Sequence, residues 1–400
     1  MTITDSGTSS YVIVVSFGEL DGLTLDNPAS GQGLYILSID GSAVLRNVKI
    51  TRGVVYESNK PKLFWYKPIY FTFLVCQADL QNVTISDSTI PMGPMFSLVF
   101  STFSLRNIHI SKATIGSVLL SSLSTGTVCD MVIDRVDGNM QTFLGGSSAV
   151  NFTNILLSNS HISGVTAYSS ATVLLTNFSL LNCSAPNFLY FRKAQVTASN
   201  ITVLQSQLSA FVLFLVETQL SFAHFYISQS VVNEMRLTKS NATLTDSAFR
   251  SLRSSNSFLR CDNSQVQLFS VSMTAVTTAG EMAQVSQGSS LRLDGCEFDQ
   301  TSSEGQVGWL LSGSSLHISD SHFSRFDFCV FQGIAANVTI SNSLFTSGGN
   351  PVQQLRSPAV YGGALSCTDC PLVLIHNSKF DPISDKLGDA VVGKRLPLGN

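Results

Sequence analysis

Four acidic residues close together in the repeat register could hold a metal ion. Asp294, Glu297 and Asp299 fall within six residues of one another, and Asp320 follows about 25 residues after the first of them. Carboxylate oxygens at this density suit Ca²⁺. The four residues are therefore the candidate metal site, although carboxylates that line an exposed bend give the same pattern. No other cofactor is expected.

An aromatic and basic segment, residues 56–70, is the second candidate site. Trp, Tyr, Phe and Lys crowd together here, and the segment contains two prolines. Exposed rings stack on sugars or anchor protein partners. The alternative is a cap in which Phe64, Trp65 and Tyr66 cover an open sheet edge. The candidate binding residues are Lys62, Phe64, Trp65, Tyr66, Lys67 and Tyr70.

The eight cysteines are mostly dispersed and have apolar neighbours, which indicates buried free thiols. Cys367-Thr-Asp-Cys370 is the only close pair. A local disulfide, two inert thiols, and a metal or redox site all fit this spacing. A zinc site usually needs a second such pair, which the sequence lacks.

The sequence carries no pattern of an active site. Glycoside hydrolysis needs two carboxylates about 5–9.5 Å apart on one face, and no such pair stands out. No Gly-x-Ser-x-Gly elbow supports a nucleophilic serine. The six histidines mostly occupy polar strand faces. We therefore predict no catalytic residue.

Composition limits the class of protein. Hydrophobic residues make up 44% and charged residues 12%, so Ser, Thr, Asn and Gln form the polar complement, which suits turns and exposed sheet faces. The net charge is −3 and no Lys/Arg run occurs, so we expect no nucleic-acid partner. The longest apolar runs are shorter than the ~20 residues that span a bilayer, and the start does not resemble a signal peptide. The chain is then either cytoplasmic or, as we prefer, an internal part of a longer secreted protein.

A repeat of 22–25 residues organises the chain. Ser315–Phe323 and Asn337–Phe345 are nearly the same nine residues. A corner residue, usually Asn or Asp, recurs in this register, and an apolar residue follows each corner after three positions. Asn47, His224, Ser270 and Gly295 share the register. The predicted corner ladder is Asn82, Asn107, Asp130, Asn154, Asn177, Asn200, Asp246, Asp320, Asn342 and Asn377.

A unit of this length with short strands and no helical period buries its apolar face only by stacking on copies of itself. We predict an all-β fold, a right-handed parallel β-helix of about fourteen coils. Residues 1–400 form one solenoid, with insertions at about 53–75 and 346–362. A leucine-rich repeat has a similar period, but its Asn follows the strand, whereas here Asn lies between two strands.

Gly362-Gly-Ala-Leu365, followed by Leu372–Phe380, resembles the repeats of polymorphic outer-membrane-type proteins. The array is similar to the pectin-lyase-like β-helix superfamily, and large surface proteins of protists carry similar repeats. The resemblance implies an extracellular protein. We therefore expect a non-enzymatic structural or adhesive segment of a larger cell-surface glycoprotein, which binds carbohydrate or a surface protein. A diverged polysaccharide lyase or glycoside hydrolase is the alternative, and an intracellular scaffold is a third class.

Overall fold

The structure is a computed structural model that describes residues 2–394, except 5–6, 9–10, 15–16, 27–28, 31–33, 56–70, 139–143, 163, 305–306, 327–328, 347–364 and 382–390. Every regular element in the described residues is a β-strand. No described segment is a helix of the length and apolarity needed to cross a membrane. The chain divides into two units, residues 1–197 and 198–400, and each is described by itself. Most of both predicted insertions lies outside the described residues.

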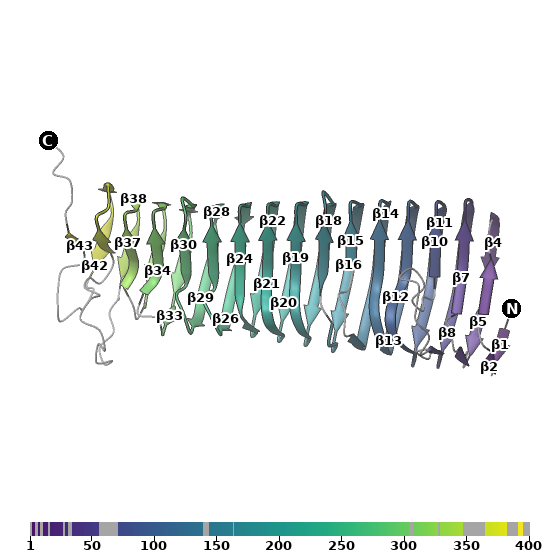
Figure 1. Ribbon diagram of the computed structural model, residues 1–400. Coiled ribbons are helices and arrows are strands. Elements are labelled where there is room, and N and C mark those ends of the chain that lie inside the picture. The colour runs from purple at the N-terminus through teal and green to yellow at the C-terminus, as the bar shows by residue number, and fades with distance from the viewer. Residues whose placement is uncertain are drawn as a thin grey trace. The chain divides into compact units, whose positions relative to one another are not determined.

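In the first unit, each strand pairs in parallel with strands about one repeat away (Figure 1). Its strands are β1 (Thr2–Thr4), β2 (Gly7–Thr8), β3 (Tyr11–Val14), β4 (Phe17–Asp21), β5 (Thr24–Asp26), β6 (Ala29–Ser30), β7 (Leu34–Ile39), β8 (Ser42–Thr51), β9 (Val54–Val55), β10 (Phe71–Leu74), β11 (Gln77–Ser86), β12 (Thr89–Val99), β13 (Thr102–Ser122), β14 (Thr125–Gly138), β15 (Leu144–Gly146), β16 (Ala149–Ser158), β17 (Val165–Tyr168), β18 (Thr172–Leu181) and β19 (Ser184–Arg192). The boundary between the units falls within β20 (Gln195–Leu204).

The second unit is built in the same way, from three stacked parallel sheets. The first sheet leads into the predicted corner and contains β22 (Gln219–Ser228), β25 (Asn241–Thr245), β28 (Gln265–Phe269), β31 (Ser290–Asp294), β35 (Ser315–Ser319), β38 (Asn337–Ser341) and β41 (Leu372–His376). The second sheet follows the corner, where β22 continues into it, and contains β26 (Ala248–Ser254), β29 (Ser272–Thr278), β32 (Glu297–Asp299), β33 (Ser302–Ser303), β36 (His322–Ser324), β39 (Leu344–Thr346) and β42 (Lys379–Asp381). The third sheet returns to the next repeat and contains β21 (Gln207–Val216), β24 (Glu234–Thr238), β27 (Leu259–Asp262), β30 (Ala283–Ser286), β34 (Val307–Ser312), β37 (Cys329–Ile334), β40 (Leu365–Thr368) and β43 (Val391–Lys394). The short strand β23 (Val231–Val232) pairs with β26 of the second sheet.

Three left-handed residues turn the chain in each repeat. All predicted corners have positive φ, from 48° at Asn377 to 60° at Gly295, so the Asn and Asp residues occupy the left-handed region that they tolerate best. A second left-handed residue lies about seven positions before the predicted corner, as at Val75, and a third lies five positions after it, as at Arg325. We call these the first, Asn and third corners. The sequence analysis identified only the Asn corner.

Serine occupies the position after many corners and points inward. Ser101, Ser124, Ser240, Ser264 and Ser321 are 2–4% exposed. In each, the hydroxyl donates to a carbonyl two residues back and accepts a backbone N–H from the preceding repeat: the Ser240 N–H donates to Ser264 Oγ at 3.1 Å, and the Cys296 N–H donates to Ser321 Oγ at 3.1 Å. These hydroxyls accept N–H groups that a corner turns away from the sheet, and a buried N–H without an acceptor is costly. The serine content therefore serves the interior as well as the turns and exposed faces that composition suggested.

Several cysteines replace serine at the same position. Cys76, Cys183, Cys296 and Cys370 each follow a left-handed residue and are 1–7% exposed. The Cys296 thiol contacts the Leu268 and Asp294 carbonyls at 3.3 and 3.5 Å, as a serine hydroxyl does there. Burial raises the pKa of the Cys183 and Cys296 thiols, so they remain protonated donors at neutral pH. The prediction of buried thiols is confirmed for these residues.

The corner asparagines form hydrogen-bonded ladders on the outside. Asn47, Asn82 and Asn107 each donate Nδ2–H to the carboxyl or amide oxygen one repeat before them, at 2.7–2.9 Å. Asp21 ends this ladder, because an ionised carboxylate only accepts hydrogen bonds. In the second unit the Asn377 amide donates to Asn342 in the same way, at 2.9 Å.

The interior columns match the predicted apolar series. The residue three positions after each Asn corner is at most 2% exposed from Ile85 to Leu180 in the first unit and from Val203 to Phe345 in the second. Phe298, Phe323, Phe345 and Phe380 stack at 4.6–4.8 Å with interplanar angles of 4–8°. The prediction of an all-β parallel β-helix is confirmed, with about twelve turns where about fourteen coils were predicted. A single domain over 1–400 stays a prediction.

Exchanging the residues at two corners tests the left-handed geometry. Val75 has φ 53° and is 51% exposed, whereas Asn82 has φ 55° and donates within the ladder. Val75→Asn relieves a conformation that costs an L-residue roughly 1–2 kcal/mol, so we expect higher stability. Asn82→Val should lower stability by at least as much. Urea unfolding of both variants measures the change, and equal signs for the two would contradict the account.

Ser321 tests the buried hydroxyls. Ser321→Ala leaves the Cys296 N–H without its acceptor, and we expect a loss of about 1–3 kcal/mol. Ser321→Cys puts a sulfur where the hydroxyl oxygen lies, as in the natural cysteines at this position, and should lose less. Ser315→Ala is the control, because this serine lies outside the interior column. If Ser321→Ala unfolds at the same urea concentration as the control, the corner hydroxyls do not stabilise the fold.

Candidate functional site

The predicted aromatic and basic site lies outside the described residues. Lys62, Phe64, Trp65, Tyr66, Lys67 and Tyr70 all fall in the gap 56–70. The structure therefore neither places these side chains nor tests the alternative of a cap. The site stays a prediction.

The four predicted calcium ligands lie on three elements and point to different partners. Asp294 ends β31 and pairs with Arg292 at 3.0 Å. Asp299 ends β32, and both Arg325 and Ser324 donate to its carboxylate. Glu297 is exposed on the same strand, and Asp320 is itself an Asn corner. Within the described ranges, no three His, Cys, Asp or Glu side chains come close enough to hold a metal.

The close cysteine pair lies inside the second unit. Cys367 and Cys370 are 3% and 1% exposed, and Cys370 carries a free thiol. Both sulfur atoms face Gly333 on the neighbouring strand β37: a Cβ there would lie 3.0 Å from the Cys370 sulfur and 3.2 Å from the Cys367 sulfur. The structure therefore places two buried sulfur atoms side by side against Gly333, which fits the interpretation as inert thiols.

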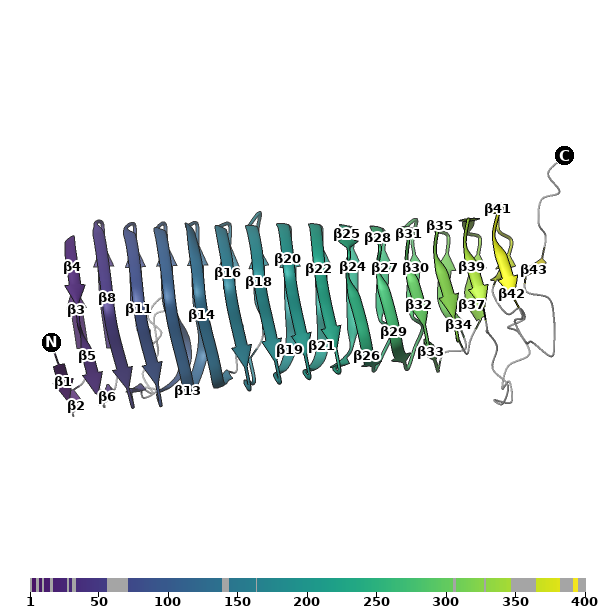
Figure 2. The same cartoon turned by 180° about the vertical axis from the view of Figure 1, so that it is seen from behind.

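The outer face of the first sheet in the second unit is lined by amide and hydroxyl side chains. Strands β25, β28, β31, β35 and β38 pair in register (Figure 2). This register aligns their outward residues in columns across strands ~4.8 Å apart. We call this surface the amide–hydroxyl face. Two of its columns are Asn241, Gln265, Ser290, Ser315, Asn337 and Thr243, Gln267, Arg292, His317, Thr339.

One ring and one ion pair interrupt this face. The Arg292 guanidinium lies 5.5 Å from the centroid of the half-buried Phe269 ring and pairs with Asp294 on its own strand. Because the two charges neutralise each other, the face presents mainly neutral hydrogen-bonding groups. Such a surface suits hydroxyl-rich or peptide ligands that run across the strands.

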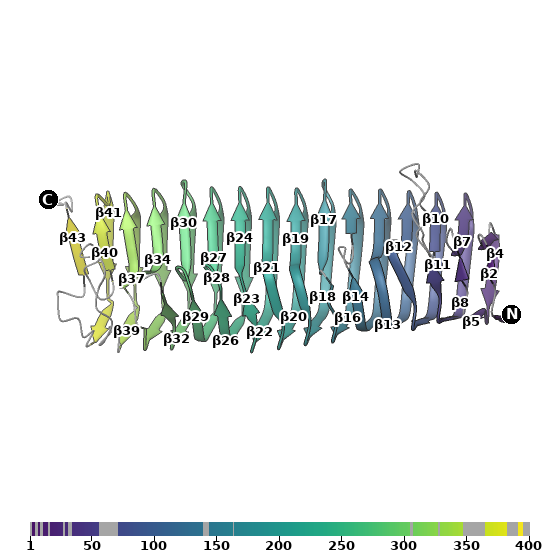
Figure 3. The same cartoon turned by 60° about the horizontal axis from the view of Figure 1, so that its bottom comes forward.

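A charged cluster lies on the third sheet of the second unit. Arg236 on β24 is in register with Arg260 on β27, and Thr238 with Asp262 (Figure 3). The Asp262 carboxylate lies 4.0 Å from Arg236 and 3.5 Å from Arg260, and Ser286 on β30 donates to its other oxygen at 2.6 Å. Glu234 begins β24, two residues before Arg236. We call Glu234, Arg236, Arg260 and Asp262 the arginine patch.

The polar atoms of the arginine patch are incompletely paired. Glu234 is 4% exposed, and one of its buried carboxyl oxygens has no hydrogen-bond partner. Burial raises the pKa of Glu234, and the two arginines oppose that shift. The Nε atoms of Arg236 and Arg260 are buried and likewise make no hydrogen bond. The patch therefore holds buried hydrogen-bonding capacity that the described residues do not fill.

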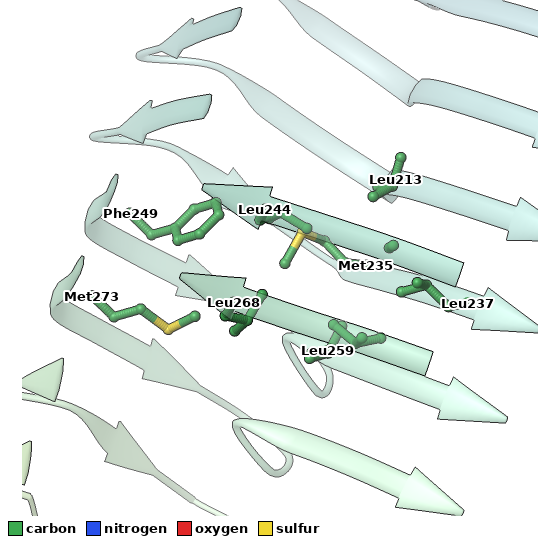
Figure 4. A pocket seen from close by; sticks show the side chains of 10 residues that line it. Leu213, Met235, Leu237, Leu244, Phe249, Leu259, Leu268 and Met273 are labelled. Atoms are coloured by element: carbon green, nitrogen blue, oxygen red, sulfur yellow. The ribbon is translucent and has the colours of Figure 1, made fainter. Parts of the chain in front are cut away.

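A cavity of about 10 Å³ lies in the interior of the second unit (Figure 4). Phe249, Met273, Leu244 and Leu268 are among its lining side chains, and all of the lining is apolar. A space this small and apolar is at the lower limit for one water molecule. It is a packing gap near the point where Met273 interrupts the phenylalanine column, and we assign no ligand to it.

The arginine patch was not among the sites predicted from the sequence. Arg236 and Arg260 are 24 residues apart, which matches the repeat, so the spacing could have shown that they are neighbours. Glu234 could not have been placed, because the register between β21 and β24 shifts between Phe211 and Leu213. A bulge of this kind re-aims side chains locally.

The ion pair of Asp299 predicts a pH dependence. The hydrogen bond from Arg325 holds the pKa of Asp299 below its usual range. The ion pair contributes fully to stability when the pH is above the Asp299 pKa of the unfolded chain, about 3.9. This contribution is lost as the pH falls through the lower pKa that Asp299 has in the folded protein. Below pH ~4, we expect the urea midpoint of Asp299→Asn to fall less steeply with decreasing pH than that of the wild type. Urea midpoints against pH measure this, with Asp320→Asn as control, and parallel curves would contradict it.

Comparisons with known proteins support no family assignment. No protein-family model matches the chain, and no curated protein matches it. Among solved structures, PfbA, a surface adhesin of Streptococcus pneumoniae, is similar at 10% identity, with 90% of this chain and 83% of that chain covered and a TM-score of 0.26. The PL6 family alginate lyase AlyGC is similar at 8% identity, with 99% and 95% covered and a TM-score of 0.16. These values carry no functional argument, and membership of the pectin-lyase-like superfamily stays a prediction.

Proposed function

We propose that this chain is a non-enzymatic structural and adhesive β-helix, a segment of a larger extracellular surface protein, that binds carbohydrate or protein through its amide–hydroxyl face. The observation that carries the proposal is the in-register alignment of neutral hydrogen-bonding side chains across β25, β28, β31, β35 and β38. Because the columns repeat with every strand, one ligand that crosses the strands meets similar groups several times.

The energetics of such a face favour extended ligands. A single hydrogen bond contributes only about 0.5–1.5 kcal/mol net in water. Several equivalent groups along one ligand add to a useful affinity, whereas one isolated group does not. Gln265 and Gln267 are exposed on β28, with Asn241 and Asn337 on strands to either side of it. These four amides supply both donors and acceptors to a hydroxyl-rich or peptide chain.

A polysaccharide-active enzyme is the second candidate, and the arginine patch is the observation that bears on it. Glu234 and Asp262 lie on neighbouring strands, and burial raises the pKa of Glu234, as a general acid requires. However, Glu234 is 4% exposed and Asp262 8%. A sugar cannot reach these carboxylates unless the surrounding strands move, so the geometry favours binding over catalysis.

Calcium at Asp294, Glu297, Asp299 and Asp320 remains part of the proposal as a secondary site. Two of these carboxylates would have to leave Arg292 and Arg325 to reach a shared ion. Unfolding temperatures with calcium chloride and with a chelator decide this. A calcium-dependent rise that Asp299→Asn removes supports the site, and equal temperatures refute it.

Binding to an array of neutral and acidic oligosaccharides tests the proposed function. The face variant combines Thr243→Val with Gln267→Met, which keeps side-chain shape and removes hydrogen bonding. The control combines Thr274→Val on the second sheet with Gln207→Met on the third. We expect the wild type and the control to bind the same saccharide and the face variant to bind it at least tenfold more weakly.

Two results would contradict this proposal. Equal binding by the face variant would move the site elsewhere. Release of shorter products from a polysaccharide, abolished by Glu234→Gln, would show that the protein is an enzyme. Binding to none of the saccharides would remove carbohydrate from the proposal and leave a protein ligand for the face.

A further inference from the structure

The arginine patch offers hydrogen-bond donors that the described residues do not use. Each guanidinium carries five N–H donors, yet among the described residues Arg236 and Arg260 form ion pairs with Asp262 alone, at 4.0 and 3.5 Å. Their side chains are 35% and 38% exposed, although their Nε atoms are buried. About a third of each side chain is therefore accessible to solvent, while its Nε atom is held inside the patch. Two pre-positioned guanidinium groups on adjacent strands suit a planar anion such as a carboxylate.

The two carboxylates within the patch leave the arginines able to bind a further carboxylate. Asp262 already accepts a hydrogen bond from Ser286 at one oxygen, and its other oxygen lies at ion-pair distance from both arginines. Glu234 is almost fully buried, and burial favours its neutral form. Both carboxylates are less than 10% exposed, whereas the two arginine side chains are 35% and 38% exposed, so the accessible groups of the patch are the positive ones. An incoming carboxylate would then complete the pairing.

An apolar pair of rings lies beside the arginines. Phe214 on β21 is in register with Arg236, and Phe211 with Glu234. The two rings are half-buried, 4.6 Å apart and tilted by 50°. At this angle the two rings do not form one flat surface. A sugar ring therefore has no flat face to stack on, whereas an apolar side chain can contact the ring edges. The bulge between Phe211 and Leu213 lies at the same place, and bulges often occur beside functional sites.

We propose that the arginine patch binds an acidic and apolar segment of a partner protein, with Arg236 and Arg260 donating hydrogen bonds to a carboxylate and Phe211 and Phe214 contacting an adjacent apolar side chain. Arginine and aromatic residues are the types enriched at the energetic centres of protein interfaces. The patch lies on the third sheet, so this inference goes beyond the amide–hydroxyl face and names a second surface with its own ligand chemistry.

Fluorescence polarisation with a labelled peptide tests the proposal. The probe is acetyl-(Glu-Ser-Leu-Ser)2-amide, which places Glu and Leu on one side of an extended chain, and the comparison peptide has Gln in place of Glu. The test variant is Arg236→Gln with Arg260→Gln. The matched control is Arg250→Gln with Arg253→Gln on β26 of the second sheet, which changes the net charge equally.

We expect the acidic peptide to bind the wild type and the control with the same Kd. The patch variant should bind it at least tenfold more weakly, and the Gln peptide should bind the wild type at least tenfold more weakly. Equal binding by patch variant and control would overturn the proposal. A soluble polyuronate that binds the wild type through the patch, when the acidic peptide does not, would also overturn it and would identify an acidic glycan as the ligand.

Chemical labelling of arginines in the wild type tests the proposal without any variant, so it does not depend on a variant that folds. Phenylglyoxal modifies accessible arginines, and mass spectrometry locates the modified residues. We expect the acidic peptide to slow modification of Arg236 and Arg260 and to leave Arg250 and Arg253 unchanged. Unchanged rates at all four would contradict the proposal. The Thr243→Val, Gln267→Met variant should still bind the peptide, so failure of the face and failure of the patch are separate results.

Discussion

The structure depends on how the chain turns without losing its backbone hydrogen bonds. The hydrogen bonds between parallel strands are regular only where the chain is extended. At each left-handed corner, the backbone N–H of the residue after the corner points away from the neighbouring strand and needs another acceptor. The hydroxyl of a buried serine in the following repeat accepts that N–H, as Ser264 does for Ser240 and Ser321 does for Cys296. Because the donor belongs to one repeat and the acceptor to the next, the corners also fix the register between neighbouring repeats. At Cys296 a thiol occupies the serine position and donates to the Leu268 carbonyl at 3.3 Å.

This arrangement separates stability from recognition. Interior columns of Ile, Leu and Phe, the corner serines and the external asparagine ladders hold the repeats together within each unit. The outward residues between corners are then free to vary, which explains why the first sheet of the second unit carries amides and hydroxyls while the third sheet carries Arg236, Arg260 and two phenylalanines. A change at Gln267 or Arg260 removes few contacts that the fold requires, whereas a change at Ser321 removes one that it does.

Much of the fold could be predicted from the sequence, and the reason is physical. Asparagine tolerates the left-handed region, so Asn82 or Asn342 marks a corner directly, and an apolar residue three positions later must point inward. The other two corners were hidden, because Val75, Leu123 and Arg325 give no such preference. The serine that follows many of them was the available signal, and it was interpreted as surface composition.

The sites were harder to predict than the fold. The calcium hypothesis grouped Asp294, Glu297 and Asp299 by sequence distance, but Asp294 pairs with Arg292 on its own strand and Asp299 with Arg325, the residue that follows the neighbouring strand β36. Arg236 and Arg260 become neighbours only through the repeat, and Glu234 joins them through a register shift. Charges two residues apart on one strand meet, as Arg292 and Asp294 do, but the other partners are set by pairing between strands.

Site-resolved amide hydrogen exchange tests the central claim most directly. The account predicts that the N–H groups of Ser101, Ser124, Ser240, Ser264 and Cys296, each of which follows a corner, are protected as strongly as the N–H groups in the middle of adjacent strands. If these amides exchange at the rates of exposed turns while the strand amides stay protected, the buried hydroxyls do not accept them and the account of the corners is wrong.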